Sequence, residues 1–285
     1  MKRVLFILFT ATAFSVLTAF EWPVSQILPT SLFGQKTESS VECGIRLQNS
    51  QLVRSAGNGT LIMILEKGNP MTSFPNTLGN AAIIAHDEGL ISVYGNLQSH
   101  DHLQNRTTIE AGAILGESGT SGCAPEGTTF FQIIDQLKRR YINPLLVLPA
   151  LADSRKPTIK TATLTGDNGR VHTLARAKSL RQGRYQLHAD TSDTLDEVRN
   201  ELATFRITVL LNGSEYTNIA FEVILSKSGK LFLGTDCQDT DSLYDDLGQV
   251  YLGDISLARG KNDISIIARD VIGNERIATY SITAE

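Results

Sequence analysis

Cysteine, tryptophan and excess charge of either sign are all scarce in this sequence. Its 285 residues include three cysteines, one tryptophan, and 26 basic against 30 acidic residues, for a net charge of -4. Without a positive excess, the chain has no broad field that would gather nucleic acid or anionic lipid. Cys43, Cys123 and Cys237 allow one disulfide and leave one thiol over, which excludes a disulfide-rich scaffold.

The sequence also lacks an apolar run of the length that crosses a membrane. The longest one follows Lys2 and Arg3 and ends near Ala19, short of the roughly 20 residues that a spanning helix needs. A basic start followed by a short apolar stretch and a polar segment is typical of a secretory signal peptide. The sequence therefore predicts a signal peptide at residues 1–20 and an exported protein, with a retained anchor as the alternative.

Helical periodicity is scarce before residue 150, and short strand-like segments take its place. They are rich in β-branched and aromatic side chains and are separated by glycines. We expect an antiparallel β domain here, ending at a polar, proline-bounded linker. The predicted parts are a signal peptide at 1–20, an irregular lead-in at 21–31, a first β domain at 32–149, a linker at 150–157 and a second domain at 158–285.

Beyond the linker, about eight short strands at roughly even spacing predict a β-sandwich. Turn signals such as Asn212-Gly213 and Ser228-Gly229 separate them. The segment from Asp270 to Asn274 resembles the last hairpin turn of bacterial immunoglobulin-like domains. The one helix candidate is residues 192–203, for which a loop is the alternative. The predicted fold class is therefore all-β, with an antiparallel β-sheet domain followed by an immunoglobulin-like β-sandwich.

Several common catalytic motifs are absent. The sequence has no phosphate-binding glycine loop and no Gly-x-Ser-x-Gly element. Ser118, Ser121 and Thr128 have no evident base partner, so a serine hydrolase is not indicated. The acidic loop at residues 236–246 has carboxylate spacing suited to calcium. It lacks the glycine and terminal Glu of a helix-loop-helix calcium site, so a solvated turn is favoured.

An ordered series of motifs runs through the first half. Its parts are Phe33-Gly34, Glu42-Cys43-Gly44-Ile45-Arg46, Gly79-Asn80, His86, Gly89, Tyr94-Gly95-Asn96-Leu97, a glycine-rich segment at 109–122, a strand at 127–133 and Ile142-Asn143-Pro144. In this order the series resembles the lysostaphin/LytM family of zinc peptidoglycan endopeptidases. The resemblance covers roughly residues 32–148.

The resemblance implies a zinc site of two His and one Asp, with further His residues around a reactive water. Every one of these positions carries another residue in this chain. Glu42 stands at the first ligand His and Arg46 at the ligand Asp. Asn96 stands at the His of Tyr-x-His-Leu, and Thr128 and Phe130 stand at the two His of the last strand. Because Phe cannot ligate a metal and Arg46 is a permanent cation, we expect neither a metal nor a catalytic residue.

Two arrangements of the former ligand positions are open. Glu42 and Arg46 lie four residues apart on an expected strand and hence on one face, so they can pair and fill part of the metal space. Alternatively, both face solvent. The resemblance also places Tyr94, His86, Cys43 and Cys123 along a binding groove, with His86 in a structural role and a Cys43–Cys123 disulfide as one option.

The resemblance implies a pseudo-peptidase of the periplasm or cell envelope, without catalysis and without a cofactor. Its partner is peptidoglycan, a cell-wall hydrolase that it regulates, or another envelope protein, and no membrane span is expected in the mature chain. Degenerate relatives activate cell-wall amidases, but the coiled coil often attached to them is missing here. One alternative is a hydrolase with a rebuilt zinc or acid-base site made from Glu42, Glu126, His86 and His102. A replacement metal site at residues 99–102 with Cys43 or Cys123, and a role as a structural spacer, are the others.

Overall fold

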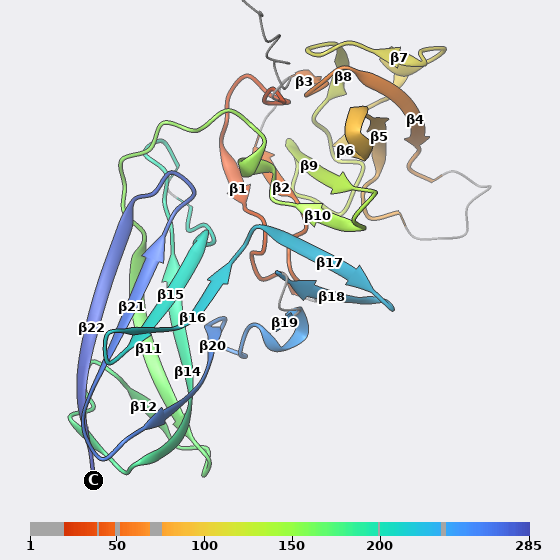
Figure 1. Ribbon diagram of the computed structural model, residues 1–285. Coiled ribbons are helices and arrows are strands. Elements are labelled where there is room, and N and C mark those ends of the chain that lie inside the picture. The colour runs from red at the N-terminus through yellow and green to blue at the C-terminus, as the bar shows by residue number, and fades with distance from the viewer. Residues whose placement is uncertain (1–19, 39, 49–51, 69–75, 199, 235–237) are drawn as a thin grey trace, which may run out of the picture.

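The computed structural model describes residues 20–38, 40–48, 52–68, 76–198, 200–234 and 238–285 (Figure 1). Over these ranges the chain consists of strands, loops and short 3-10 turns, with no α-helix. The all-β prediction is confirmed. The signal peptide predicted at residues 1–20 falls almost wholly outside the described residues.

The first half builds a twisted sheet and a small ribbon. Its strands are β1 (Pro29–Ser31), β2 (Ile45–Gln48), β3 (Leu52–Arg54), β4 (Gly59–Leu65), β5 (Asn80–Ala85), β6 (Leu90–Leu97), β7 (Thr108–Ile109), β8 (Ile114–Glu117), β9 (Thr128–Asp135) and β10 (Arg140–Ile142). The 3-10 turns η1 (Asp87–Gly89), η2 (Asp101–Leu103) and η3 (Pro144–Leu146) connect them.

The second half is elongated, and its strands are longer. They are β11 (Thr158–Gly166), β12 (Val171–Thr173), β13 (Ser179–Leu180), β14 (Gly183–Ser192), β15 (Arg206–Leu211), β16 (Ser214–Ala220), β17 (Val223–Lys227), β18 (Lys230–Leu233), β19 (Gln238–Asp239), β20 (Val250–Leu257), β21 (Gly260–Arg269) and β22 (Glu275–Ala284). The turn η4 (Thr240–Ser242) follows β19.

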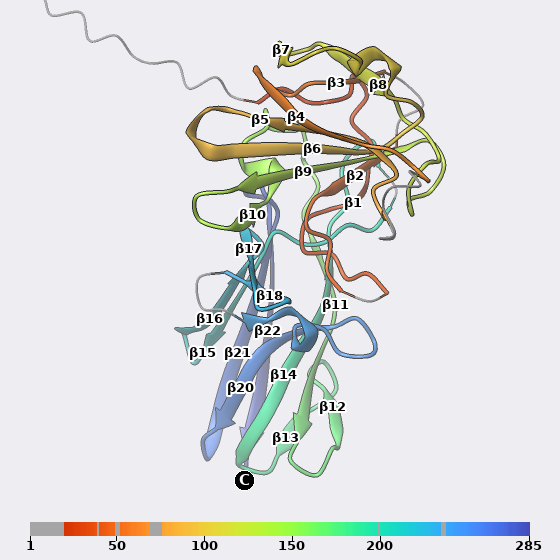
Figure 2. The same ribbon diagram turned by 90° about the vertical axis from the view of Figure 1, so that its right-hand side faces the viewer.

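Strand β9 is central to the first sheet. It pairs with β6 along one side, and with β2 and then β10 along the other (Figure 2). From β6 the sheet continues through β5 and β4 to β7, while β3 and β8 form the separate ribbon. Six of the eight residues of β9 are buried, because strands flank it and side chains cover both faces.

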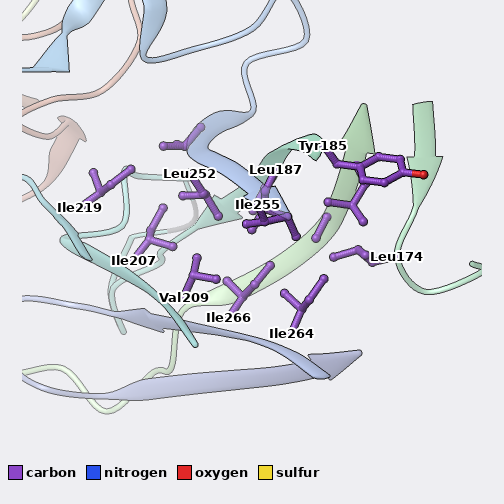
Figure 3. Packing of buried hydrophobic residues seen from close by; sticks show 14 of the residues in the cluster. Leu174, Tyr185, Leu187, Ile207, Val209, Ile219, Leu252, Ile255, Ile264 and Ile266 are labelled. Atoms are coloured by element: carbon purple, nitrogen blue, oxygen red, sulfur yellow. The ribbon is translucent and has the colours of Figure 1, made fainter. Parts of the chain in front are cut away.

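Two sheets of the second half pack face to face around one apolar core. One sheet has the order β12-β11-β14-β20 and the other β13-β22-β21-β15-β16. Figure 3 shows Ile207 and Val209 of β15 beside Ile264 and Ile266 of β21, opposite Leu252 of β20. In β21 every second residue is buried, as the two-residue period of a strand requires. The predicted β-sandwich is confirmed.

Residues 223–239 leave the sandwich and join the first sheet. Strand β17 pairs antiparallel with β10, with Tyr141 opposite Ile224, and β18 and β19 extend the sheet further. In Figure 1 these strands lie between the two halves. The prediction that 158–285 forms a sandwich alone therefore needs correction. The physical reason is that β10 offers an unpaired edge, which β17 satisfies with backbone hydrogen bonds.

The two halves also meet through side chains at the start of the chain. Gly34 has φ of 80°, and a Cβ added there would lie 2.1 Å from Cδ1 of Phe221, so only glycine fits this contact. The hydroxyl of Tyr244 donates to the carbonyl oxygen of Gly34 at 2.7 Å. Phe33 and Phe221 are both 1% exposed, so the joint is a packed interior.

The helix candidate at residues 192–203 is wrong. The described part of this segment forms turns closed by a β-bridge between Asp193 and Leu202. Leu195, Val198 and Leu202 are buried against the core of the first half. Tertiary packing of these apolar side chains outweighs the modest helical preference of the segment.

Candidate functional site

Three of the five positions that the family resemblance singled out lie on the paired strands β2 and β9, while Glu42 precedes β2 and Asn96 lies on β6. Arg46 lies directly opposite Phe130, and Gln48 lies opposite Thr128. Because side chains two residues apart share a face of a strand, Thr128 and Phe130 point the same way. We call Glu42, Arg46, Asn96, Thr128 and Phe130 the degenerate site.

Glu42 and Arg46 form an ion pair at this site. Nε of Arg46 donates to Oε2 of Glu42 at 2.6 Å. The side chain of Glu42 is 7% exposed and that of Arg46 is 27% exposed. The pairing hypothesis is therefore confirmed, and the alternative in which both side chains face solvent is wrong. A buried carboxylate needs such a partner, because its transfer from water is otherwise costly.

Phe130 covers the pair from the neighbouring strand. The guanidinium carbon of Arg46 lies 5.5 Å from the centre of the Phe130 ring, within the range of a cation–π contact. A Cβ at Gly44 would lie 2.8 Å from Cε2 of Phe130 and 2.5 Å from the carbonyl oxygen of Phe131. The bare backbone at Gly44 therefore lets the Phe130 ring occupy this space.

Asn96 ties the neighbouring loop to β9. Its Nδ2 donates to the carbonyl oxygens of Thr128 at 2.7 Å and Gly119 at 2.9 Å, and its Oδ1 accepts from the backbone N of Gly122 at 2.8 Å. The hydroxyl of Thr128 donates to the carbonyl oxygen of Pro125 at 2.6 Å. Asn96 and Thr128 are each 2% exposed. Their polar groups are thus committed to holding the fold.

These residues do not fit a zinc ion. The site has no imidazole or thiolate ligand, its carboxylate is engaged by Arg46, and the amide of Asn96 is bonded on both sides. Zinc in proteins takes nitrogen, sulfur and carboxylate ligands in a tetrahedron. A fixed guanidinium and a phenyl ring in that space oppose a divalent cation. The residues of the degenerate site therefore do not fit a catalytic metal.

His86 and Tyr94 belong to a structural hydrogen-bond chain. Nδ1 of His86 lies 2.7 Å from the carbonyl oxygen of Asn58, and Nε2 lies 2.6 Å from Oγ of Ser92. Oγ of Ser92 is 3.0 Å from the Tyr94 hydroxyl, which accepts from the backbone N of Ala56 at 2.7 Å. Burial lowers the pKa of His86, partly offset by the bond to Asn58.

Neither His86 nor Tyr94 lines a groove at the degenerate site. Tyr94 is fully buried. Ser92, which holds His86, lies four residues from Asn96 along β6, or about 13 Å at the rise of a strand. The interpretation of Tyr94 as a groove residue therefore needs correction, because its ring packs inside the sheet against Phe131 at 5.3 Å between centroids.

The two described cysteines are free thiols, so the Cys43–Cys123 disulfide is not formed. Cys43 is half-buried against Tyr141 and the core of the second half, whereas Cys123 is exposed. Burial, and then the neighbouring Glu42, raises the pKa of the Cys43 thiol to about 12. Cys237 lies outside the described residues.

This difference predicts selective alkylation. With iodoacetamide at pH 8, Cys123 should be modified while Cys43 stays protected, because the thiolate is the reactive form and Cys43 is almost wholly protonated. Peptide mass spectrometry measures both sites. In urea both should react, which serves as the control. Equal rates in the folded protein, or a Cys43–Cys123 bridge in the intact mass, would contradict the described geometry.

The residues of the alternative sites stay apart. His102 and Glu126 are exposed on different loops, and His100 pairs with Glu66 at 2.9 Å instead of with a cysteine. In the part of the chain that the structure describes, three or more His, Cys, Asp or Glu groups converge in one place only, at Asp153, Asp193 and Asp270. The acidic loop at residues 236–246, whose first two residues are not described, is not that place.

Comparison with known proteins agrees with the resemblance. The chain is 36% identical over 130 residues to an uncharacterized protein of Treponema pallidum (strain Nichols), covering 40% of this chain and 86% of that protein. A family model described as peptidase family M23 matches residues 41–144. The chain belongs to peptidase family M23 through this region. A second family model matches residues 156–285, beyond the M23 domain.

Two solved structures are similar to part of the chain. The catalytic domain of the antimicrobial peptidase lysostaphin from Staphylococcus simulans has 16% identity and a TM-score of 0.33, covering 39% of this chain and 81% of that chain. A zinc containing peptidase from Vibrio cholerae has 18% identity and a TM-score of 0.36, covering 48% of this chain and 41% of that one. Among its described residues, the M23 chain has no helix long and apolar enough to cross a membrane.

Proposed function

We propose that this protein is an exported, non-catalytic member of peptidase family M23 that acts in the bacterial cell envelope by binding. The observation that carries the proposal is the degenerate site, where the Glu42–Arg46 pair, the Phe130 ring and the Asn96 network replace the expected ligands. The family chemistry needs an open metal position and a reactive water. The residues here supply neither, so binding is the activity that remains.

A protein partner is favoured by strand β4 at the outer part of the M23 sheet. β7 pairs with β4 at Gly59 and Thr60, and the backbone N of Leu61 donates to the carbonyl oxygen of Thr107 at 2.8 Å. Beyond Leu61, that edge has no strand beside it among the described residues. Ile62 and Met63 on this stretch are 51% and 52% exposed. An unpaired edge with apolar side chains is suited to binding an extended segment as an added strand.

Purified protein should bind its target without releasing wall fragments. We expect less than stoichiometric zinc by metal analysis after purification without chelator, and no muropeptide release from peptidoglycan sacculi, because the ligands and the water position are missing. An active M23 peptidase on the same sacculi is the positive control. Release of muropeptides that zinc chelation or the change Glu42→Gln abolishes would support the rebuilt hydrolase and overturn this proposal.

The same preparation separates the two kinds of partner. Capture of an envelope protein that is lost in Ile62→Lys and kept in Leu137→Lys, an exposed apolar position outside β4, would support binding at the β4 edge. Co-sedimentation with sacculi, unchanged in Ile62→Lys, would instead indicate peptidoglycan as the ligand. Absence of both would contradict a binding role and favour the structural spacer.

A further inference from the structure

Three aspartates from distant parts of the chain converge where the two halves meet. Asp153 comes from the connection before β11, Asp193 directly follows β14, and Asp270 directly follows β21. One carboxylate oxygen from each lies within 4.8 Å of the others. Asp193 is 4% and Asp270 is 2% exposed. These strand ends lie at the end of the sandwich nearest the M23 domain (Figure 1).

The cluster lines a small, partly open space, which we call the joint cavity. Its volume is about 20 Å³, enough for one water or one ion. Apolar residues such as Leu32, Leu145 and Leu195 form much of its wall, and no Lys or Arg is among the described residues that line it. Two arginines near these residues in sequence have carboxylate partners outside the cluster: Arg155 pairs with Asp196 at 3.4 Å, and Nη2 of Arg206 pairs with Glu222 at 2.5 Å, although Nε of Arg206 has no partner.

Two oxygens of the joint cavity have no hydrogen-bond partner. Thr204 is 2% exposed, and its buried hydroxyl has no hydrogen-bond partner. Oδ2 of Asp153 is likewise buried and unpartnered. Thr204 and Asp153 both line the cavity. An unsatisfied buried polar group costs about 1 to 3 kcal/mol, and more when charged, so these oxygens indicate a missing ligand.

The remaining carboxylate oxygens are arranged to accept a cation. Oδ1 of Asp270 accepts from the backbone N of Ile272, Gly273 and Asn274 at 2.6 to 2.9 Å, whereas Oδ2 accepts only from Nδ2 of Asn274 at 2.7 Å. This leaves a lone pair on Oδ2. One oxygen of each of the three carboxylates lies within 4.8 Å of the others, and no Lys or Arg is among the described residues that line the cavity. Like charges held this close call for a neutralising partner.

We propose that Asp153, Asp193 and Asp270, with the hydroxyl of Thr204, bind a calcium ion in the joint cavity. Calcium takes oxygen ligands at about 2.3 to 2.6 Å, so ligands on opposite sides of one ion stand up to about 5.2 Å apart. The described spacing of at most 4.8 Å lies within that limit. The ion locks the 150–157 connection to the sandwich and thereby fixes the orientation of the M23 domain.

Calcium should raise the thermal stability of the full chain. After removal of metal with EDTA, calcium at about a hundredfold excess over its Kd should raise Tm by about 5 °C or more, because it binds only the folded form. Extracellular calcium sites have Kd values of about 10⁻⁴ to 10⁻³ M, so the titration extends to about 100 mM at constant ionic strength and is followed by calorimetry. No rise and no binding heat at these concentrations would overturn the proposal, and an equal response to Mg²⁺ would overturn the choice of calcium.

Two variants locate the ion. Asp153→Asn should abolish the calcium-induced rise in Tm. In EDTA its Tm should equal or exceed that of the unchanged protein, because the variant has less like-charge repulsion. If Asp153 had only a structural role, its substitution would lower the Tm in EDTA. Thr204→Val should weaken binding about tenfold through loss of one oxygen ligand. Asp241→Asn, an exposed carboxylate of the acidic loop, is the matched control. If Asp241→Asn removes the response and Asp153→Asn does not, the site lies in the acidic loop and the joint-cavity proposal is wrong.

Discussion

Arg46→Met should lower the free energy of unfolding by about 3 to 5 kcal/mol, one of the largest effects expected for this protein. The change keeps an unbranched side chain beside Phe130 but leaves the carboxylate of Glu42 buried at 7% exposure without its cation. Breaking a buried pair from one side leaves an uncompensated charge, which costs more than the intact pair contributes. Urea unfolding followed by the fluorescence of the single tryptophan measures the loss.

The second single variant of this double-mutant cycle changes Glu42, the partner of Arg46. Glu42→Gln retains an oxygen that accepts from Nε of Arg46, and the guanidinium, at 27% exposure, can still reach water. Its cost should stay near 1 kcal/mol. The double variant Glu42→Gln and Arg46→Met should recover at least half of the loss seen in Arg46→Met. A double variant as unstable as the single one would show that packing on Phe130, and not the buried charge, sets the effect.

Asn96→Asp should be comparably damaging although it conserves shape. The new carboxylate oxygen would face the carbonyl oxygens of Thr128 and Gly119 at the 2.7 and 2.9 Å now bridged by Nδ2. At 2% exposure it has no access to water. The loss of two donated hydrogen bonds together with burial of an unpaired charge predicts a cost of about 3 kcal/mol or more. Chemical denaturation at neutral pH is the measurement.

Asn105→Asp is a closely matched control for this change. Asn105 has φ of 61°, against 62° for Asn96, so the left-handed backbone is common to both positions. Asn105 is exposed, and its substitution should change stability by no more than about 0.5 kcal/mol. If both variants lose the same amount, the backbone conformation and not the Asn96 network accounts for the effect.

The pattern of short strands was sufficient to predict the all-β fold. The five positions of the degenerate site came from the family resemblance. The sequence prediction placed Glu42 and Arg46 on one face of one strand. The two side chains do pair, but Glu42 precedes β2, which begins at Ile45 after bends at Cys43 and Gly44, so the reason given for their pairing was wrong. The complete burial of Tyr94 could not be predicted from its sequence neighbours. Its place depends on the hydroxyl finding the backbone N of Ala56 within the sheet interior, which is a tertiary contact.

Contacts between distant parts of the chain explain why the sequence did not predict the β10–β17 pairing or the cluster of three aspartates. β17 pairs with β10 across about 80 residues, and no property of residues 223–227 alone distinguishes that strand from one of the sandwich. The three clustered aspartates are equally dispersed along the chain. Of the three, only Asp270 lies in a segment with a recognisable local pattern, and that pattern predicted a hairpin turn. The pattern of carboxylates that suggested calcium was instead the acidic loop at 236–246.

The pairing of β10 with β17 constrains how such a chain can evolve. Recombination at the 150–157 connection would replace the second half by another domain. The edge of β10 from Arg140 to Ile142 would then lose its hydrogen-bonding partner, unless the new domain carried a hairpin equivalent to β17 and β18. The Phe221 ring that meets Gly34 would leave with it. Substitutions on either side of the shared sheet are therefore expected to co-vary in chains that carry both halves.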